Sequence, residues 1–186
     1  FYSSVLPHIY KFLLKQSREF STEALNVHEQ MLRMRGRPKV ILARDYEEAL
    51  ELYGRYGKNM LGVITDVSFK HEGAKDRKAG LTLARYLRSK DSTLPIIVES
   101  TESENRMFVR DFGGVFIDKN SKKLSVDLEK EIKLNFGFGE FILHDPSSGE
   151  SVGTIKSVNE LQKRIFSIPD EVLYYHCRRN EVSRWL

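Results

Sequence analysis

The stretch LGVITD, from Leu61 to Asp66, decides the fold that we predict for this chain. It is a short apolar run, rich in β-branched residues, and it ends on a carboxylate. A run of this length is typical of a strand buried on both faces inside a parallel sheet. Open α/β sheets bind their ligands at the carboxyl ends of the strands, so Asp66 is predicted to face a crevice. Taken alone, a strand-ending Asp is more often a turn cap, so the other strands have to be considered.

The composition is that of a globular chain with one good core and room for a small appendage. Of its 186 residues, 40% are hydrophobic and 30% charged, which excludes wholesale disorder. No stretch approaches the length of a transmembrane helix, no signal peptide is visible, and the single Cys177 excludes an internal disulfide. We therefore expect a cytoplasmic protein without a membrane partner. Because the chain begins with Phe1 rather than Met, we expect it to be a piece of a longer one.

The charge balance is mildly basic and spread over both signs, with a net charge of +4. The densest basic patch comprises Arg33, Arg35, Arg37 and Lys39, which a nucleic-acid backbone could use. A solvated connector before the next strand is the better interpretation. A basic nucleic-acid-binding module therefore stays a third hypothesis, and it predicts binding that weakens steeply with salt.

Strand-like and helix-like stretches alternate along the first 134 residues, which predicts βαβ units and a mostly parallel sheet flanked by helices. The last residues, 135–186, lack this alternation and are predicted to form a small α+β appendage. The expected elements of the first part are helices over 4–15 and 19–34, a strand over 40–43, a helix capped by Asp45 and closed by Gly54 and Gly57, the strand 61–66, a solvated polar loop over 67–79, a helix opened by Gly80, a strand over 96–98, a helix over 102–111, a strand over 115–117 and a helix over 121–134.

Three of the predicted strands deliver polar residues to one edge of the sheet. Asp66, Ser100 and Lys119 each follow an apolar strand. A carboxylate at such an edge can act as a nucleophile, while a hydroxyl and an ammonium compensate charge on a transferred group. The order of these residues therefore predicts a phosphoryl site.

In this order the chain resembles the receiver domain of two-component response regulators, over roughly residues 40–134. Asp66 in GVITD matches the family's phosphoacceptor, Ser100 in PIIVES its hydroxyl residue and Lys119 in FIDK its lysine. Phe116 matches the aromatic switch residue, and Gly80 the glycine that starts the third helix. The resemblance implies a flavodoxin-like fold, a histidine kinase or another phosphodonor as partner, and Mg²⁺ as cofactor.

More narrowly, nearly the whole chain resembles the N-terminal receiver-like segment of some bacterial phosphoenolpyruvate synthase and pyruvate phosphate dikinase-like proteins. The resemblance rests on four stretches: FYSSVLPHIY, RMRGRPKVILARDYEEALELYGRY, NFGFGEFILHDPSSGE and IPDEVLYYHCRRNEVSRWL. It implies a regulatory role without catalytic turnover for this chain, and downstream catalytic domains as its partners in a phosphotransferase. A second copy of the chain is left open as a further partner.

The chain also departs from the receiver pattern. The family's first strand and its paired acidic residues have no counterpart, so the central strand of the expected 2-1-3-4-5 order is missing. The stretch 141–145 has some strand character and an acidic end, and it is one candidate replacement. Only Asp66 and the backbone of Ser68 are left to ligate Mg²⁺, which normally needs more carboxylates. Thr101 narrows the predicted entrance, and Asn120 stands where many receivers have Pro.

The appendage is predicted to contain a hairpin over 136–155, a helix over 157–166 with a Ser157–Glu160 capping box, and a helix that starts at Pro169. A metal site on His144 and His176 and nucleophilic chemistry at Cys177 were both considered. Neither has a recognisable spacing, so structural roles are the better interpretation. The aromatic residues of the appendage are predicted to pack or to contact a downstream domain, namely Tyr174, Tyr175 and Trp185.

Two functions therefore follow from the residues and the resemblance. The first is a receiver-like regulatory domain that is phosphorylated on Asp66 and controls a downstream phosphotransfer enzyme. The second is a pseudo-receiver that keeps the fold as an interaction or dimerisation module and is not phosphorylated. The missing acidic pair and Thr101 favour the second function.

Overall fold

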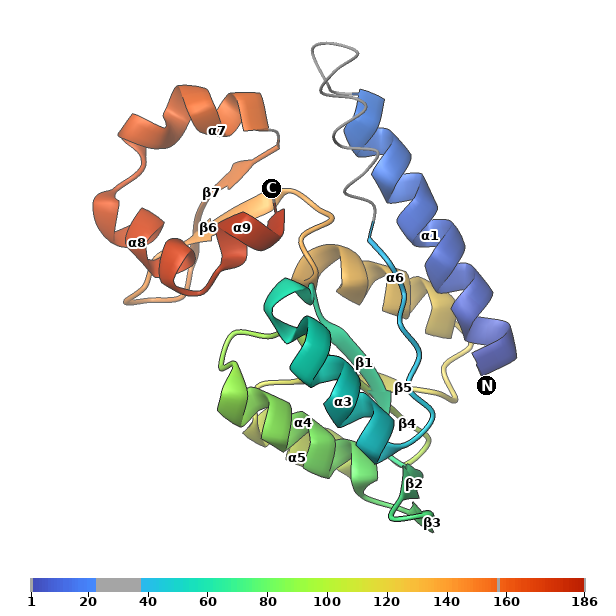
Figure 1. Ribbon diagram of the computed structural model, residues 1–186. Helices are drawn as coiled ribbons and strands as arrows, with labels where there is room; N and C mark the ends of the chain where they lie inside the picture. The colour runs from blue at the N-terminus through green and yellow to red at the C-terminus, as the bar shows by residue number, and fades with distance from the viewer. Residues whose placement is uncertain (1, 23–37, 157, 186) are drawn as a thin grey trace.

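The chain forms a mixed α/β structure around a three-stranded parallel sheet, followed by a smaller unit with its own hairpin (Figure 1). The sheet has the order β1-β4-β5, and its strands are β1 (Val63–Asp66), β4 (Ile96–Ser100) and β5 (Val115–Asp118). Both pairings are parallel, and all five residues of the central strand β4 are buried. The predicted parallel sheet with flanking helices is therefore confirmed.

The structure is a computed structural model that describes residues 2–22, 38–156 and 158–185. Two short strand pairs accompany the main sheet, β2 (Phe69–His71) with β3 (Ala74–Asp76) and β6 (Phe141–His144) with β7 (Ser151–Ile155). The helices are α1 (Tyr2–Thr22), α3 (Tyr46–Tyr56), α4 (Ala79–Lys90), α5 (Asn105–Asp111), α6 (Leu124–Asn135), α7 (Val158–Arg164), α8 (Asp170–Arg178) and α9 (Glu181–Trp185), with the 3-10 turns η1 (Gly57–Asn59) and η2 (Ile165–Ser167).

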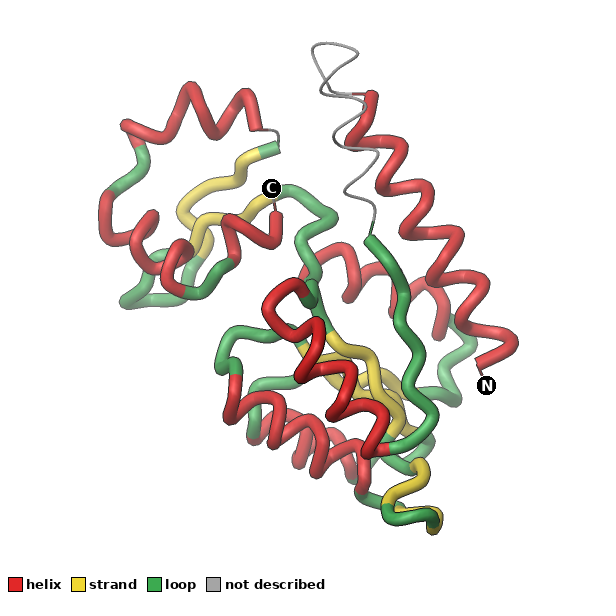
Figure 2. Tube along the Cα trace, in the orientation of Figure 1, coloured by secondary structure: helices red, strands yellow, loops and turns green. Residues whose placement is uncertain are grey.

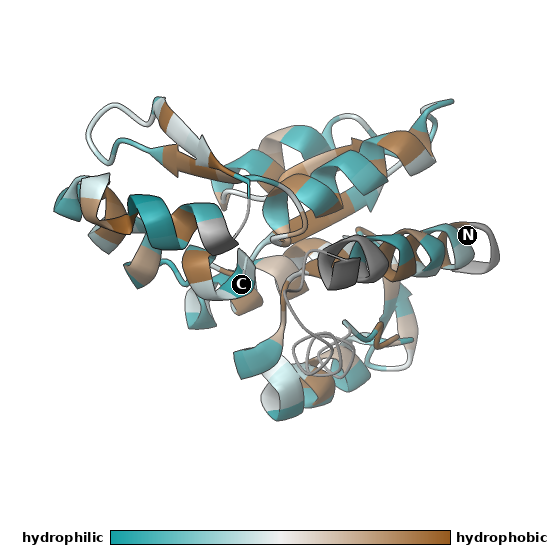
Figure 3. Ribbon diagram, turned by 90° about the horizontal axis from the view of Figure 1, so that it is seen from above, coloured by the Kyte–Doolittle hydropathy of each residue, from teal (hydrophilic) through white to brown (hydrophobic). Residues whose placement is uncertain are grey.

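Two apolar layers hold the helices to the sheet. On one face, α1 and α6 pack against the sheet through residues such as Phe12, Ile132 and Ile117. On the other face, α3, α4 and α5 pack against it around Leu87 and Val98. Apolar and polar residues alternate along α1 in Figure 3, as expected for a helix with one buried side. With both faces covered, the polar residues of the sheet gather at the ends of its strands.

The strand predicted over 40–43 is not formed. The backbone is irregular there, and Figure 2 shows it as a loop that runs along the outside of the fold. Val40, Ile41 and Leu42 are 39, 45 and 41% exposed. A strand needs a neighbour for its backbone hydrogen bonds, and β1 pairs only with β4 in the described part of the chain. The other edge of β1, called here its open edge, is therefore unpaired among the described residues.

The candidate replacement strand, 141–145, does not fill this gap. Its residues 141–144 form β6, which pairs antiparallel with β7 in a separate sheet. This pairing confirms the predicted hairpin of the appendage. It also shows that the polar end of the stretch serves the turn, because the Asp145 carboxylate accepts hydrogen bonds from the backbone of Ser147 and Ser148.

Helix α3 begins after Asp45 and ends before Gly57, as predicted, but Gly54 does not close it. Asp45 is its N-cap, with the carboxylate accepting a 2.8 Å hydrogen bond from the Glu48 backbone. Gly54 lies inside the helix rather than ending it, and Gly57 follows it in η1. The first helix is longer than predicted and extends to Thr22, while most of the second predicted helix lies outside the described residues.

The polar segment 67–79 is more ordered than predicted. It contains the β2–β3 hairpin rather than only a solvated loop. The signal that was missed is the pair Glu72-Gly73, whose φ angles of 52° and 77° are those of a two-residue hairpin turn. The hairpin follows β1 directly, so it lies beside the end of that strand.

The C-terminal unit has an apolar core of its own. Its hairpin and helices pack around residues such as Phe141, Ile155 and Trp185. The helix predicted from Pro169 is broken in two, because Asn180 has a φ of 54° between α8 and α9. Ser157, half of the predicted capping box, lies outside the described residues, while Glu160 accepts a hydrogen bond from the Lys156 backbone.

Candidate functional site

The three residues predicted to share a sheet edge line one cavity. β1 ends on Asp66 and β4 on Ser100, and the Lys119 backbone donates a 2.9 Å hydrogen bond to the Ser100 carbonyl. The cavity has a volume of about 490 Å³. Its lining consists of Asp66, Val67, Ser68, Lys75, Arg77, Ser100, Thr101, Glu102 and Lys119.

The Asp66 carboxylate is held at both oxygens. Its Oδ2 forms a short ion pair with Lys119 Nζ, and its Oδ1 accepts a 3.3 Å hydrogen bond from the Ser68 backbone. Both side chains of the ion pair are largely sheltered from solvent, at 26% exposure for Asp66 and 12% for Lys119. Partial burial strengthens the attraction between the two charges relative to a pair in water. The carboxylate is therefore fixed in one orientation at the mouth of the cavity.

Gly80 allows the backbone after Asp66 to lie against helix α4. A Cβ atom at position 80 would stand 1.8 Å from the Asp66 carbonyl oxygen, so no side chain fits there. The Gly80 backbone also donates a 2.9 Å hydrogen bond to the Val67 carbonyl. The predicted importance of this glycine at the start of the helix thus has a steric cause.

The Ser100 hydroxyl is buried and oriented by the start of α5. It accepts 3.0 Å hydrogen bonds from the Glu102 backbone and from Asn105 Nδ2. A hydroxyl that accepts two hydrogen bonds still has its own proton to donate. Asn105 was not predicted as a site residue, and its buried amide fixes the orientation of Ser100.

The two residues that depart from the receiver pattern are in contact with each other. Thr101 is exposed and lines the cavity, and its carbonyl accepts a 3.0 Å hydrogen bond from Asn120 Nδ2. The Asn120 backbone in turn donates to Asp118 Oδ1. Asn120 therefore ties the loops after β4 and β5 together, a role that a proline at this position could not fill.

Phe116, the predicted switch residue, does not line the cavity. It packs at the border of the core on the α3–α5 face. The Arg106 guanidinium lies 4.7 Å from the centre of its ring. Phe116 and Arg106 line a second hollow, which lies over β5 and α6.

Glu99 is a site residue that sequence reasoning missed. It is 3% exposed, its Cα is the register partner of Asp66, and its Oε1 atom has no hydrogen-bond partner among the described residues. Burial raises the pKa of Glu99 to about 7. The positive charge of Lys119 opposes this rise in pKa, and the negative charge of Asp66 adds to it. The signal in the sequence is a glutamate that continues the apolar run PIIVES, which indicates a carboxyl group inside a buried strand.

The residues present do not fit a divalent cation. The predicted Mg²⁺ ligands were Asp66 and the backbone of Ser68, and the only other carboxylate lining the cavity is Glu102. Three cationic side chains share this lining, and no cluster of three metal-binding side chains occurs in the described ranges. Mg²⁺ can take most of its six oxygen ligands from water and phosphate, but it needs a carboxylate, and the Asp66 carboxylate is already paired with Lys119. No step of the chemistry below is therefore assigned to a metal.

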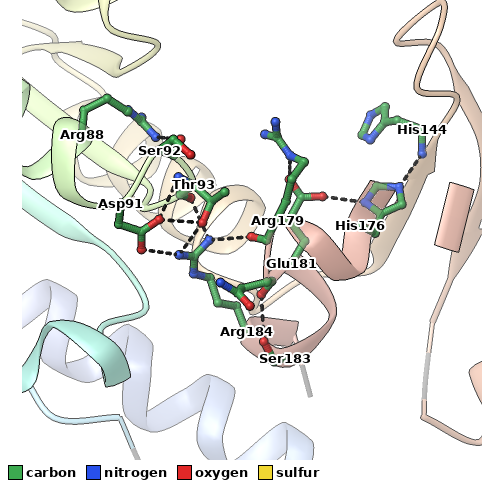
Figure 4. Close-up of polar contacts among 11 residues, drawn as sticks. Arg88, Asp91, Ser92, Thr93, His144, His176, Arg179, Glu181, Ser183 and Arg184 are labelled. Atoms are coloured by element: carbon green, nitrogen blue, oxygen red, sulfur yellow. Dashed lines mark hydrogen bonds and ion pairs between the residues drawn. The ribbon is translucent and has the colours of Figure 1, made fainter. Parts of the chain in front are cut away.

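The polar residues considered in the appendage have structural contacts (Figure 4). His176 is fully buried, its Nε2 accepts a 2.9 Å hydrogen bond from the His144 backbone, and its Nδ1 lies 2.5 Å from Glu181 Oε2. Burial alone would raise the pKa of Glu181, but hydrogen bonds from His176 and Arg179 lower it below its usual value. His176 therefore links the hairpin to α9.

The other candidates of the appendage are separate from the cavity. Cys177 is exposed. Trp185 is buried and donates a 2.7 Å hydrogen bond to the Gly139 carbonyl, which supports the predicted packing role. Tyr174 and Tyr175 lie beside arginine side chains of the same helix and of the following turn. Most of the basic patch predicted as a nucleic-acid site, 33–37, lies outside the described residues, and Lys39 is exposed.

None of the described helices is both long enough and apolar enough to cross a membrane. Comparisons of the chain with protein-family models, with curated proteins and with solved structures find no match.

Proposed function

We propose that this chain is a receiver-like regulatory module with a flavodoxin-like fold, in which Asp66 accepts a phosphoryl group. The observation that carries the proposal is the cavity at the carboxyl edge of the parallel sheet, where Asp66, Lys119 and Ser100 meet. As the sequence resemblance implies, the module would act in the cytoplasm on a downstream phosphoenolpyruvate synthase-like or dikinase-like enzyme. It would have no catalytic turnover of its own beyond accepting and losing the phosphoryl group.

The proposed reaction transfers one phosphoryl group from a donor to Asp66. A carboxylate oxygen attacks the phosphorus atom, and an acyl phosphate bond to the aspartate forms. The bond between phosphorus and the leaving group of the donor breaks, and the leaving group departs with the electron pair. The carboxylate released from an acyl phosphate stays ionised, whereas an imidazole leaving group takes a proton from the solvent. Lys119 and Ser100 stabilise the negative charge that is spread over the oxygens of the transferred group in the transition state.

The conformational response would start at Lys119. The acyl phosphate carries about two negative charges where the carboxylate carried one, and its oxygens compete for the ammonium that now pairs with the carboxylate. Ser100 would move toward the same oxygens, which loosens its hydrogen bond with Asn105 at the start of α5. Phe116 belongs to β5 and its ring lies under the Arg106 guanidinium of α5, so a shift of α5 would reposition it.

Incubation with a small acyl phosphate, with and without Mg²⁺, tests the proposal by intact mass. The wild-type protein should gain one acid-labile phosphoryl group, and Asp66→Asn should gain none. Asp118→Asn is the matched control, because Asp118 ends strand β5 of the same sheet and does not line the cavity. Phosphorylation of Asp66→Asn at the wild-type level, or no phosphorylation of the wild-type protein, would rule the proposal out.

A second function is favoured by the open edge of β1 and by the poor fit of the site to a metal. In that case the chain is a pseudo-receiver that binds a partner or a second copy of itself without phosphorylation. The exposed residues 40–42 would then take part in the contact. Sedimentation measurements on the wild-type protein and on Ile41→Lys test this function. A dimer that Ile41→Lys disrupts supports it, and monomers in both proteins rule out a dimerisation module.

A further inference from the structure

The β2–β3 hairpin has two chemically different faces. Side chains alternate along a strand, so Phe69 and His71 share one face while Lys70 points to the other. On the first face, Phe69 packs against the core, and the His71 ring lies 4.3 Å from the ring of Tyr46 in α3. Asp76 belongs to this face too, with its Oδ2 3.3 Å from His71 Nδ1. This face anchors the hairpin to the fold.

Hydrogen bonds hold both the tip of the hairpin, at Glu72, and its base, at Asp76. The Glu72 backbone donates a 2.9 Å hydrogen bond to Glu47 Oε1 in α3, and the Lys78 backbone donates a 2.7 Å hydrogen bond to Asp76 Oδ1. The hairpin pairs Lys70 with Lys75 between these two points. The opposite face is therefore held in place relative to the cavity.

That opposite face is cationic. Lys75 and Arg77 are two residues apart, and both line the cavity that contains Asp66. Lys70 lies directly across from Lys75, and like charges in this position destabilise a strand pair. None of the three forms an ion pair with another residue of the described part of the chain. An anion bound at this face would relieve the repulsion.

We propose that Lys75 and Arg77 are an anion-binding arm, which holds a small phosphate-bearing ligand noncovalently in the cavity over Asp66. We identify this ligand as the phosphodonor, and that identification rests on the proposed function. The cavity volume of about 490 Å³ suits a small molecule. The lining has three cationic side chains and two carboxylates, and one of these carboxylates is already paired with Lys119. The arm therefore supplies the charge that an incoming phosphate needs to approach the anionic nucleophile.

Arg77 gives this arm a preferred geometry. A guanidinium can bind two oxygens of one phosphate at once, whereas the ammonium of Lys75 contributes a single point charge. The two cations would bind the oxygens of the phosphate that are not attacked, on the hairpin side of the cavity. Lys119 approaches from β5, so the phosphate would lie between cations of two separate elements.

Titration with inorganic phosphate, followed by NMR chemical shifts at fixed ionic strength, tests the arm without any phosphoryl transfer. The combined variant Lys75→Gln and Arg77→Gln should weaken phosphate binding by roughly tenfold, the effect of losing charge-assisted contacts. Lys122→Gln with Lys123→Gln is the matched control, because this exposed pair lies outside the cavity lining. All four positions are exposed, so melting temperatures should stay close to the wild-type value.

Asp66→Asn separates this inference from the proposed function. It removes a carboxylate from the cavity, so phosphate should bind this variant at least as tightly as it binds the wild-type protein. Phosphate binding without phosphorylation of Asp66 would leave the anion-binding arm in place and reject the acceptor role. Equal affinity in the wild-type protein and the Lys75 and Arg77 variant would overturn the inference, as would a wild-type protein that binds no phosphate.

Discussion

The polar network at the sheet edge and the polar network of the C-terminal unit are satisfied to different degrees. In the C-terminal network, both ring nitrogens of His176 have partners, and the Arg184 guanidinium donates to Asp91, to both oxygens of Thr93 and to the Arg179 carbonyl (Figure 4). This network joins α8 and α9 to the hairpin β6–β7 and to the loop after α4. The His176 ring and the Arg184 guanidinium thus have the hydrogen bonding that is expected of a structural contact.

The sheet edge is less complete. Three buried side-chain atoms in the described part of the chain have no hydrogen-bond partner, and two of them, Ser68 Oγ and Glu99 Oε1, lie at or next to Asp66. The third is Arg88 Nε, whose guanidinium is otherwise bonded to the carbonyls of Ser92 and Gly113. Unsatisfied buried groups cost stability, and functional sites are where such costs are retained. This difference is the one expected between a ligand site and a structural joint.

Gly80→Ala should have the largest effect, because it acts on the backbone that carries the sheet edge. The new Cβ would lie 1.8 Å from the Asp66 carbonyl oxygen, and neither backbone can move without disrupting β1 or α4. We expect a loss of about 4 kcal/mol in the free energy of unfolding, measured by urea denaturation.

Gly54→Ala is the matched control for this substitution. Gly54 lies inside α3, and a Cβ there meets no atom within 4 Å. Alanine favours a helix interior over glycine, so this variant should gain roughly 0.5–1 kcal/mol. Equal effects of the two substitutions would contradict the close approach at Gly80.

His176→Ala should have the next largest effect and should act on stability alone. It removes a fully buried ring and leaves the Glu181 carboxylate without one of its partners. We expect the free energy of unfolding to fall by about 3 kcal/mol, with phosphate binding at the sheet edge unchanged. His144→Ala should cost much less, because His144 contacts His176 through its backbone N–H. A parallel loss of phosphate binding in His176→Ala would show that the two networks are coupled.

The sequence predicts the parts of the fold that rest on local patterns. Apolar runs ending on Asp66, Ser100 and Lys119 identify the strand ends and the residues of the cavity, because an apolar run and the polar residue that follows it are local features of the sequence. The run 40–43 has the same apolar, β-branched character and is still not a strand. A strand depends on a neighbour for its hydrogen bonds, and a single run cannot show whether that neighbour exists.

The missed features depend on contacts between distant residues. The hairpin after β1 has few apolar residues, and its order comes from α3 through Tyr46 and Glu47. Glu99 looks like an ordinary charged residue near a strand end. Its role follows from the register that places it beside Asp66 in the neighbouring strand.

Glu99→Gln should have a smaller effect than Gly80→Ala and His176→Ala, and the effect should depend on pH. The pKa of Glu99 is about 7 in the folded protein and 4.5 in the unfolded chain, so the folded state binds the carboxyl proton more tightly. The free energy of unfolding of the wild-type protein should therefore fall as pH rises from 5 to 8, by roughly 2 kcal/mol relative to Glu99→Gln. Urea denaturation at both pH values measures this, with the exposed Glu171→Gln as control. If wild type and Glu99→Gln lost stability in parallel, Glu99 would titrate as an ordinary carboxylate, and the sheet edge would be as well satisfied as the C-terminal network.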